Sequence, residues 1–395
     1  MVNFFDNKKI VIIYFIYLIF IYLFFLHYHL DQFPLKYVYT DWLINYEGGF
    51  VRRGLLGQII YKLSTLTDIN FKYILLTFQI FGYLLYIGLV LNFLLKIKIN
   101  FFWILLIFST ISFLYPLSEL EALGRKDIYV ILLFSVFSLL NYKTINKCIF
   151  TFLIIFTISS LIHEITFFYL PYYLILLFFI TKFKIKENLN FIHYFSIFII
   201  LGFLIYSNLI IGAKVEITEI IKSYKIINID VGLSMGAFGW LGKPFLDHFT
   251  IIMDKISLTT ILRYGYILFI NLSVFLYFIK FKKNFNFSFI EITSKKIFLG
   301  LIVITLPTYL IALDWGRMSY LNFNFMMMLT IYFKKEDLID EKFLEYKINQ
   351  ITYRLKILIF IFICFLFSPK ILIDDDLSSF PLYRTMSKIS NLINF

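Results

Sequence analysis

The stretch IVIIYFIYLIFIYLFFL (residues 10–26) contains no charged residue, and a second run, YILLTFQIFGYLLYIGLVLNFLL (73–95), shares that property. A helix needs roughly 20 apolar residues to cross a hydrocarbon core about 30 Å thick. The first run is too long for a signal-peptide core and no small-residue cleavage site follows it, so we expect a retained helix. Hydrophobic residues make up 61% of the chain and the mean hydropathy is +0.84, which excludes a soluble globular protein. We therefore predict an all-α fold, a polytopic bundle of transmembrane helices.

Polar, proline or glycine breaks divide the apolar sequence into runs that predict about eleven transmembrane helices. With the N-terminus in the cytoplasm, the cytoplasmic segments hold 20 basic and 8 acidic residues, which accounts for the whole formal charge of +12. This asymmetry follows the positive-inside rule and predicts no nucleic-acid partner. We expect a bacterial cytoplasmic (inner) membrane protein whose C-terminus lies outside. The predicted spans are 10–26, 73–95, 101–115, 128–142, 148–162, 165–181, 191–211, 262–279, 297–313, 318–333 and 355–367.

We expect a single integral membrane domain over residues 1–395, with its functional groups on the outer side. Three outer segments stand out: a first outer loop at 27–72, a second outer loop at 212–261 and the C-terminal tail from Ser368. The second carries a glycine-rich run with Trp240 and is interpreted as either a lid or a helix followed by a flexible loop. The stretch 334–356 is predicted to be a cytoplasmic surface helix that acts as a topological anchor.

The first outer loop contains YTDWLINYEGGFVRRGLLGQIIYKL (39–63), where Asp41 and Glu47 precede two glycines and the pair Arg52 and Arg53. The apolar residues that follow recur with a helical period, which predicts a short amphipathic interfacial helix entered through a Gly-Gly turn. A helix N-terminus beside two guanidinium groups is suited to binding phosphate. The alternative is an interfacial helix whose arginines simply reach the headgroups.

The connection PLSELEALGRKD (116–127) joins two runs of only 15 residues, so we expect it to lie recessed in the membrane. Its spacing predicts Glu121 and Arg125 on one helical face, next to Lys126 and Asp127. Charges at such a depth are candidates for function because their desolvation is expensive. The alternative is a self-neutralising turn at the interface.

Two further outer turns carry acid and base together. His163 and Glu164 separate two adjacent spans, and they fit either a proton-transfer pair or a helix cap. Asp314 and Arg317 flank Trp315, which fits either a sugar-binding pair or an interfacial tryptophan with a structural ion pair.

No metal or cofactor is expected. Cys148 and Cys364 lie in apolar runs far apart and form no metal or disulfide pattern. The acids at 374–376 are interpreted as a solvated turn. No nucleotide-binding loop is present.

The layout resembles membrane glycosyltransferases of the GT-C type and bacterial O-antigen or capsular polysaccharide polymerases. GT-C enzymes place an acidic residue just beyond the first span and further acids in the second outer loop, and Asp41, Glu119 and Glu121 occupy matching positions. The polymerases use outer-loop arginines that are taken to bind lipid diphosphate. The matching residues here are Arg52, Arg53, Arg125 and Arg317. The resemblance implies glycosyl transfer at the outer face from a polyprenyl-diphosphate-linked donor, in the company of other polysaccharide-assembly proteins.

Together, these residues form a candidate site for glycosyl transfer. A carboxylate would deprotonate the acceptor hydroxyl, while cations stabilise the departing diphosphate. The candidate catalytic residues are Asp41, Glu121, Asp127, His163 and Glu164. The candidate substrate-binding residues are Glu47, Arg52, Arg53, Arg125, Lys126, Asp314, Trp315 and Arg317. The competing functions are a lipid-linked glycan flippase or other polytopic transporter, and a structural assembly subunit.

Overall fold

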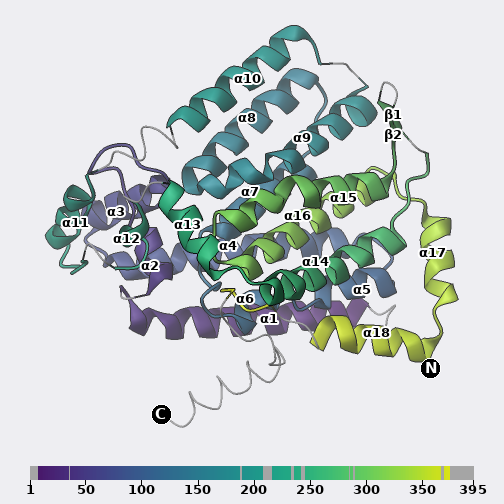
Figure 1. The fold of residues 1–395 in the computed structure, drawn as a ribbon, viewed down its shortest axis with the longest axis horizontal. Helices are drawn as coiled ribbons and strands as arrows, with labels where there is room; N and C mark the ends of the chain where they lie inside the picture. The colour runs from purple at the N-terminus through teal and green to yellow at the C-terminus, as the bar shows by residue number, and fades with distance from the viewer. Residues whose placement is uncertain are drawn as a thin grey trace. The chain divides into compact units, whose positions relative to one another are not determined.

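The structure, a computed structural model, is almost entirely helical, which confirms the predicted all-α class (Figure 1). A single two-stranded antiparallel ribbon, β1 (Phe285–Phe287) with β2 (Ile290–Ile292), is the exception among the described residues. The structure describes residues 8–34, 36–186, 189–207, 216–232, 235–241, 245–283, 285–287, 290–365 and 369–373. The acids at 374–376 and part of the second outer loop lie outside these ranges.

Five helical segments among the described residues are long and apolar enough to cross a membrane, as expected for an integral membrane protein. A sixth is possible if two helices that meet at an angle of 100°, α17 (Glu341–Gln350) and α18 (Tyr353–Phe365), form one broken span. The five segments are Lys8–Gln32, Phe71–Leu94, Ile145–Ile162, Glu164–Ile185 and Leu258–Phe278.

By length and composition, the described residues give five or six spans, so the predicted number of about eleven is not confirmed. Every predicted run contains helix, but in the run 101–115 the helix α5 (Phe101–Phe108) has only 8 residues and spans about 12 Å. In the run 318–333, α16 (Trp315–Lys335) is 21 residues long, yet it contains several polar side chains and is buried from Trp315 to Phe333. These two segments are therefore internal to the protein rather than lipid-facing.

The chain forms two compact units. Unit 1 comprises residues 1–21, 88–122 and 249–395, and unit 2 comprises residues 22–87 and 123–248. In unit 1, α14 (Leu258–Phe278) packs against α5, α15 (Ser294–Thr305), α16 and α17. Unit 1 also contains α6 (Tyr115–Ser118) and α13 (Phe245–Lys255), which starts in unit 2.

Unit 2 is built around α8, which packs against α3, α7, α9 and α10 (Figure 1). A hydrophobic core joins the first outer loop to the second, with Trp42, Ile60 and Tyr224 among its fully buried members. The helices are α1 (Lys8–His29) and α4 (Phe71–Leu94), each shared with unit 1, then α2 (Tyr37–Trp42), α3 (Gly54–Thr67), α7 (Asp127–Leu139), α8 (Ile145–Ile162), α9 (Leu170–Phe179), α10 (Phe191–Tyr206), α11 (Ile217–Ile226) and α12 (Phe238–Leu241).

The predicted helical face shared by Glu121 and Arg125 is wrong. α6 ends at Ser118 and α7 begins at Asp127, so turns occupy the residues between them. Gly124 has a φ of +76°, its N–H donates to the Tyr83 hydroxyl, and its carbonyl accepts from the Trp42 indole at 2.7 Å. A left-handed glycine with these bonds prevents a continuous helix.

The predicted helix after the Gly-Gly turn is present as α3. At Gly57, α3 packs directly against the backbone of Trp42 and Ile44, at the end of α2. A Cβ atom at Gly57 would lie 2.0 Å from the Ile44 carbonyl oxygen and 2.6 Å from that of Trp42. Only glycine fits at this contact, which holds α3 and its preceding arginines against α2.

We expect Gly57→Ala to destabilise the protein by about 1–3 kcal/mol, because backbone rather than a flexible side chain must move to admit the methyl group. Thermal unfolding in detergent measures the effect. The control is Gly88→Ala in α4, where a Cβ meets nothing within 4 Å. Equal melting temperatures for the two variants would contradict the close approach.

Candidate functional site

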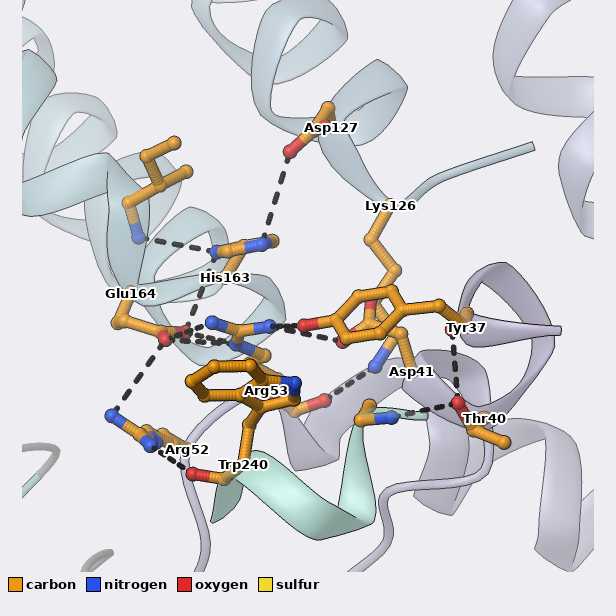
Figure 2. Close-up of polar contacts among 12 residues, drawn as sticks. Tyr37, Thr40, Asp41, Arg52, Arg53, Lys126, Asp127, His163, Glu164 and Trp240 are labelled. Carbon is orange, nitrogen blue, oxygen red and sulfur yellow. Dashed lines mark hydrogen bonds and ion pairs between the residues drawn. The ribbon is translucent and has the colours of Figure 1, made fainter. Parts of the chain in front are cut away.

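Several segments of unit 2 bring charged side chains together near the start of α3 (Figure 2). They are the first outer loop, the start of α7 and the junction at which α8 ends and the 3-10 segment Glu164–Tyr169 begins. We call this group the charged cluster. Its members are Asp41, Arg52, Arg53, Lys126, Asp127, His163 and Glu164.

The Arg53 side chain contacts Glu164, Tyr37 and Asp41. Its Nε donates to both carboxylate oxygens of Glu164, at 2.8 and 2.6 Å, and its Nη2 donates to the same carboxylate. Its Nη1 reaches the Tyr37 hydroxyl at 3.3 Å and Asp41 Oδ1 at 3.4 Å. Burial alone would lower the pKa of Arg53, but Glu164, Tyr37 and Asp41 outweigh it and raise that pKa well above its usual value. Arg53 is therefore a permanent cation that holds two carboxylates in place.

The backbone of Arg53 is also constrained. The residue has a φ of 66°, in the left-handed region, directly before α3 begins at Gly54. A residue other than glycine rarely adopts this conformation, which costs of order 1 kcal/mol or more. Its carbonyl oxygen accepts a 2.6 Å hydrogen bond from Lys126 Nζ. The ion pairs of the Arg53 side chain and the hydrogen bond to the Arg53 carbonyl therefore both stabilise this strained turn.

Lys126 is fully buried, with 0% of its surface exposed. Burial lowers the pKa of its ammonium group to about 8, although Asp41 acts in the opposite direction. The ring of Trp42 lies 5.9 Å from Nζ. Lys126 therefore changes charge close to neutral pH, in contact with the carbonyl of Arg53.

Arg52 is held much less firmly than Arg53. Its Nη2 donates to the Trp240 carbonyl at 3.3 Å, and its Nη1 lies 4.0 Å from Glu164. Its Nε is buried and has no hydrogen-bond partner among the described residues. Burial lowers the pKa of Arg52. Arg52 thus keeps hydrogen-bonding capacity that Arg53 has already used.

The helix α12 carries Trp240 to the charged cluster because Thr40 fixes the turn before it. Thr40 Oγ1 accepts the Ala237 N–H at 2.9 Å, and a Cβ at Gly236 would meet that same oxygen at 2.3 Å. Figure 2 shows Trp240 next to Arg52. The glycine-rich run interpreted as a lid therefore contacts the cluster through this short helix.

His163 links two carboxylates of the cluster. Its Nδ1 accepts the Ile165 N–H at 3.2 Å and lies 3.4 Å from Glu164 Oε2, while its Nε2 lies 3.9 Å from Asp127 Oδ1. The backbone donor at Nδ1 assigns the proton of the neutral ring to Nε2, on the side of Asp127. His163 is thus positioned between Glu164 and Asp127.

Tyr37 is a member of this site that the sequence did not single out. Its hydroxyl accepts from Arg53, and its ring stacks on the Arg125 guanidinium at 5.0 Å. In a chain with 29 tyrosines, no sequence signal marks this one. Arg125 therefore joins the edge of the charged cluster through an aromatic ring.

Other candidate residues lie elsewhere. Glu47 is exposed and pairs with Gln58 and Lys62, outside the cluster. Glu121 is exposed on unit 1. Asp314 and Arg317 form a 2.7 Å ion pair in unit 1, and the Trp315 indole donates to the Tyr309 carbonyl. The structure thus gathers seven of the thirteen candidates in one cluster, with Arg125 at its edge. Within the described ranges, no group of three or more His, Cys, Asp or Glu side chains is arranged to hold a metal ion.

We expect Glu164→Gln to destabilise the protein by about 3 kcal/mol, because it leaves the Arg53 guanidinium partly buried without its main counter-charge. Chemical denaturation in detergent measures this loss. Glu47→Gln is the matched control, since its ion pair with Lys62 is exposed and should contribute less than about 1 kcal/mol. Similar losses for both variants would argue against a central role for the Arg53 pair.

The lowered pKa of Lys126 predicts a pH-dependent difference between the wild type and Lys126→Met. Between pH 8 and the unfolded value of 10.5 the folded state binds fewer protons than the unfolded state, so this group makes the wild type more stable as pH rises. The stability of the variant relative to the wild type should fall by about 2 kcal/mol across that window. Urea unfolding of both proteins at pH 7.5 and pH 10 measures the change. A constant difference would contradict the assigned burial of a titrating ammonium.

Comparison with known proteins gives no match, so the role of the charged cluster must be inferred from its own chemistry. No family model, no curated protein and no solved structure matches the chain.

Proposed function

We propose that this protein is a glycosyltransferase that works at the outer face of the bacterial cytoplasmic membrane during surface polysaccharide assembly. Its donor would be a sugar linked to polyprenyl diphosphate. The observation that carries the proposal is the charged cluster, in which three carboxylates and three cations lie largely buried inside a membrane protein. Such groups are expensive to bury and therefore mark function by default.

The cluster supplies the two components that transfer from a diphosphate requires. Asp41 would accept the proton of the acceptor hydroxyl as its oxygen bonds to the anomeric carbon of the donor. The bond from that carbon to the phosphate oxygen breaks, and the diphosphate leaves with the electron pair. Cations next to Asp41 stabilise the charge that accumulates on the leaving group. Arg53 pairs with this carboxylate, and the adjacent residue, Arg52, would meet the leaving diphosphate.

The two adjacent arginines suit different tasks in this mechanism. Arg53 is fully engaged with Glu164, Tyr37 and Asp41, so it would orient the carboxylates rather than bind substrate. Within the described part of the chain, Arg52 has an unpartnered Nε, one hydrogen bond of 3.3 Å and one ion pair at 4.0 Å, so its guanidinium would take the diphosphate. A guanidinium binds phosphate with two parallel hydrogen bonds.

The proposed topology agrees with this chemistry. With about eleven spans and a cytoplasmic N-terminus, the first outer loop and the junction at His163 face outward, where lipid-linked donors are used. The basic residues then concentrate on the cytoplasmic side.

We expect Asp41→Asn to reduce glycosyl transfer at least 100-fold while the protein still folds, because an amide cannot accept the acceptor proton. The measurement uses purified protein in vesicles with a polyprenyl-diphosphate-linked sugar and follows glycan length. Unchanged transfer by Asp41→Asn would reject Asp41 as the base. Movement of the labelled lipid across the bilayer without any new glycosidic bond would instead identify a flippase.

We expect Arg52→Gln to raise the KM for the donor about 10-fold to 100-fold, since a charged hydrogen bond contributes about 1.5–3 kcal/mol. Arg52→Lys should recover part of this loss because it keeps the charge without the bidentate geometry. Asp41→Asn should leave the KM nearly unchanged. An Arg52→Gln variant with wild-type kinetics would contradict the role of Arg52 in diphosphate binding.

A further inference from the structure

Residues 369–373 lie in unit 1 against two of the turns that the sequence marked as polar. We call this segment the strap. Its Ile371 N–H donates to Glu119 Oε2 at 3.4 Å, and Lys370 Nζ lies 3.8 Å from Glu119 Oε1. Both carboxylate oxygens of Glu119, which is 6% exposed, therefore contact the strap.

The strap also pairs with the turn that precedes α16. The Gly316 N–H donates to the Ile371 carbonyl at 3.2 Å, and the Ile373 N–H donates to the Leu313 carbonyl at 3.1 Å. A Cβ at Gly316 would lie 2.0 Å from the Lys370 carbonyl oxygen. The strap thus runs along the Leu313–Gly316 turn at a distance that only glycine permits, beside the ion pair of Asp314 with Arg317.

A third contact comes from α14. The Tyr264 hydroxyl lies 3.0 Å from the carbonyl oxygens of both Lys370 and Leu372. Most contacts of the strap backbone are therefore made to polar groups, namely a carboxylate, a hydroxyl and the main chain of a turn. Pro369, Ile371 and Ile373 are its buried apolar anchors.

We propose that the strap is a displaceable gate over a second polar site in unit 1, formed by Glu119, the turn Leu313–Gly316 and Tyr264. The strap uses the hydrogen-bonding groups of that site as a polar ligand would. Water or such a ligand can replace each of these bonds when the strap leaves. The site is independent of the charged cluster in unit 2, so the inference does not rest on glycosyl transfer.

Thiol reactivity in the full-length protein tests whether the strap opens by itself. The reaction rate of the thiol in Ile371→Cys measures opening of the strap. The rate in Leu321→Cys measures opening of unit 1 as a whole, because Leu321 is fully buried in α16. The two native cysteines are buried, which keeps the background low. We expect the strap thiol to react at least 100-fold faster than the α16 thiol. Equal rates would overturn the proposal, because the strap would then open only when the unit unfolds.

Gly316→Ala provides the second arm, since its methyl group meets the Lys370 carbonyl. It should increase the reaction rate at Ile371→Cys at least 10-fold and leave that at Leu321→Cys unchanged. Carbodiimide labelling of Glu119, read by mass spectrometry, should increase in parallel. A Glu119 that stays protected while the strap thiol reacts would show that the strap does not cover the carboxylate. That result would overturn the gate whether or not the protein transfers sugars.

Discussion

The ion pair between Arg53 and Glu164 is the interaction on which the charged cluster depends. It joins residues 111 positions apart in sequence, and it connects the turn before α3 with the end of α8. The pair is largely shielded from water, where removal of one partner leaves an uncompensated charge. Asp41, His163 and Arg52 all contact one of its two members. The pair therefore connects these three side chains with one another.

The local backbone makes this arrangement possible. Arg53 occupies a left-handed conformation that its own side-chain and carbonyl contacts stabilise, and Gly57 lets α3 lie against the chain after α2. Lys126 bonds to the same turn from the start of α7. Strain, burial and opposite charges thus coincide at one turn, as is common where a protein pre-organises groups for chemistry. We regard the guanidinium of Arg52, which lacks such support, as the group left available to a ligand.

The polar residues of unit 1 obtain their hydrogen-bond partners in a different way from those of the charged cluster. Glu119 and the turn before α16 are covered by a segment of the same chain, residues 369–373, whereas the charged cluster of unit 2 is satisfied by pairing among its own side chains. Internal pairing fixes groups in place, while a covering strap can exchange with solvent or with a ligand. The two units therefore offer two distinct polar sites, and the proposed reaction requires only the one in unit 2.

The sequence by itself determined the all-α class and the membrane character, because apolar runs of about 20 residues have no other stable solution. It also identified most members of the charged cluster, since charged residues in short turns between apolar runs are conspicuous. It did not determine that Arg53 pairs with Glu164, that Tyr37 contributes, or that Glu121 and Arg125 lie in turns and not on one helix. Those facts depend on contacts between distant segments and on the left-handed Gly124. Pairwise electrostatics and close packing are properties of three-dimensional neighbours, so only the tertiary structure could assign the partners.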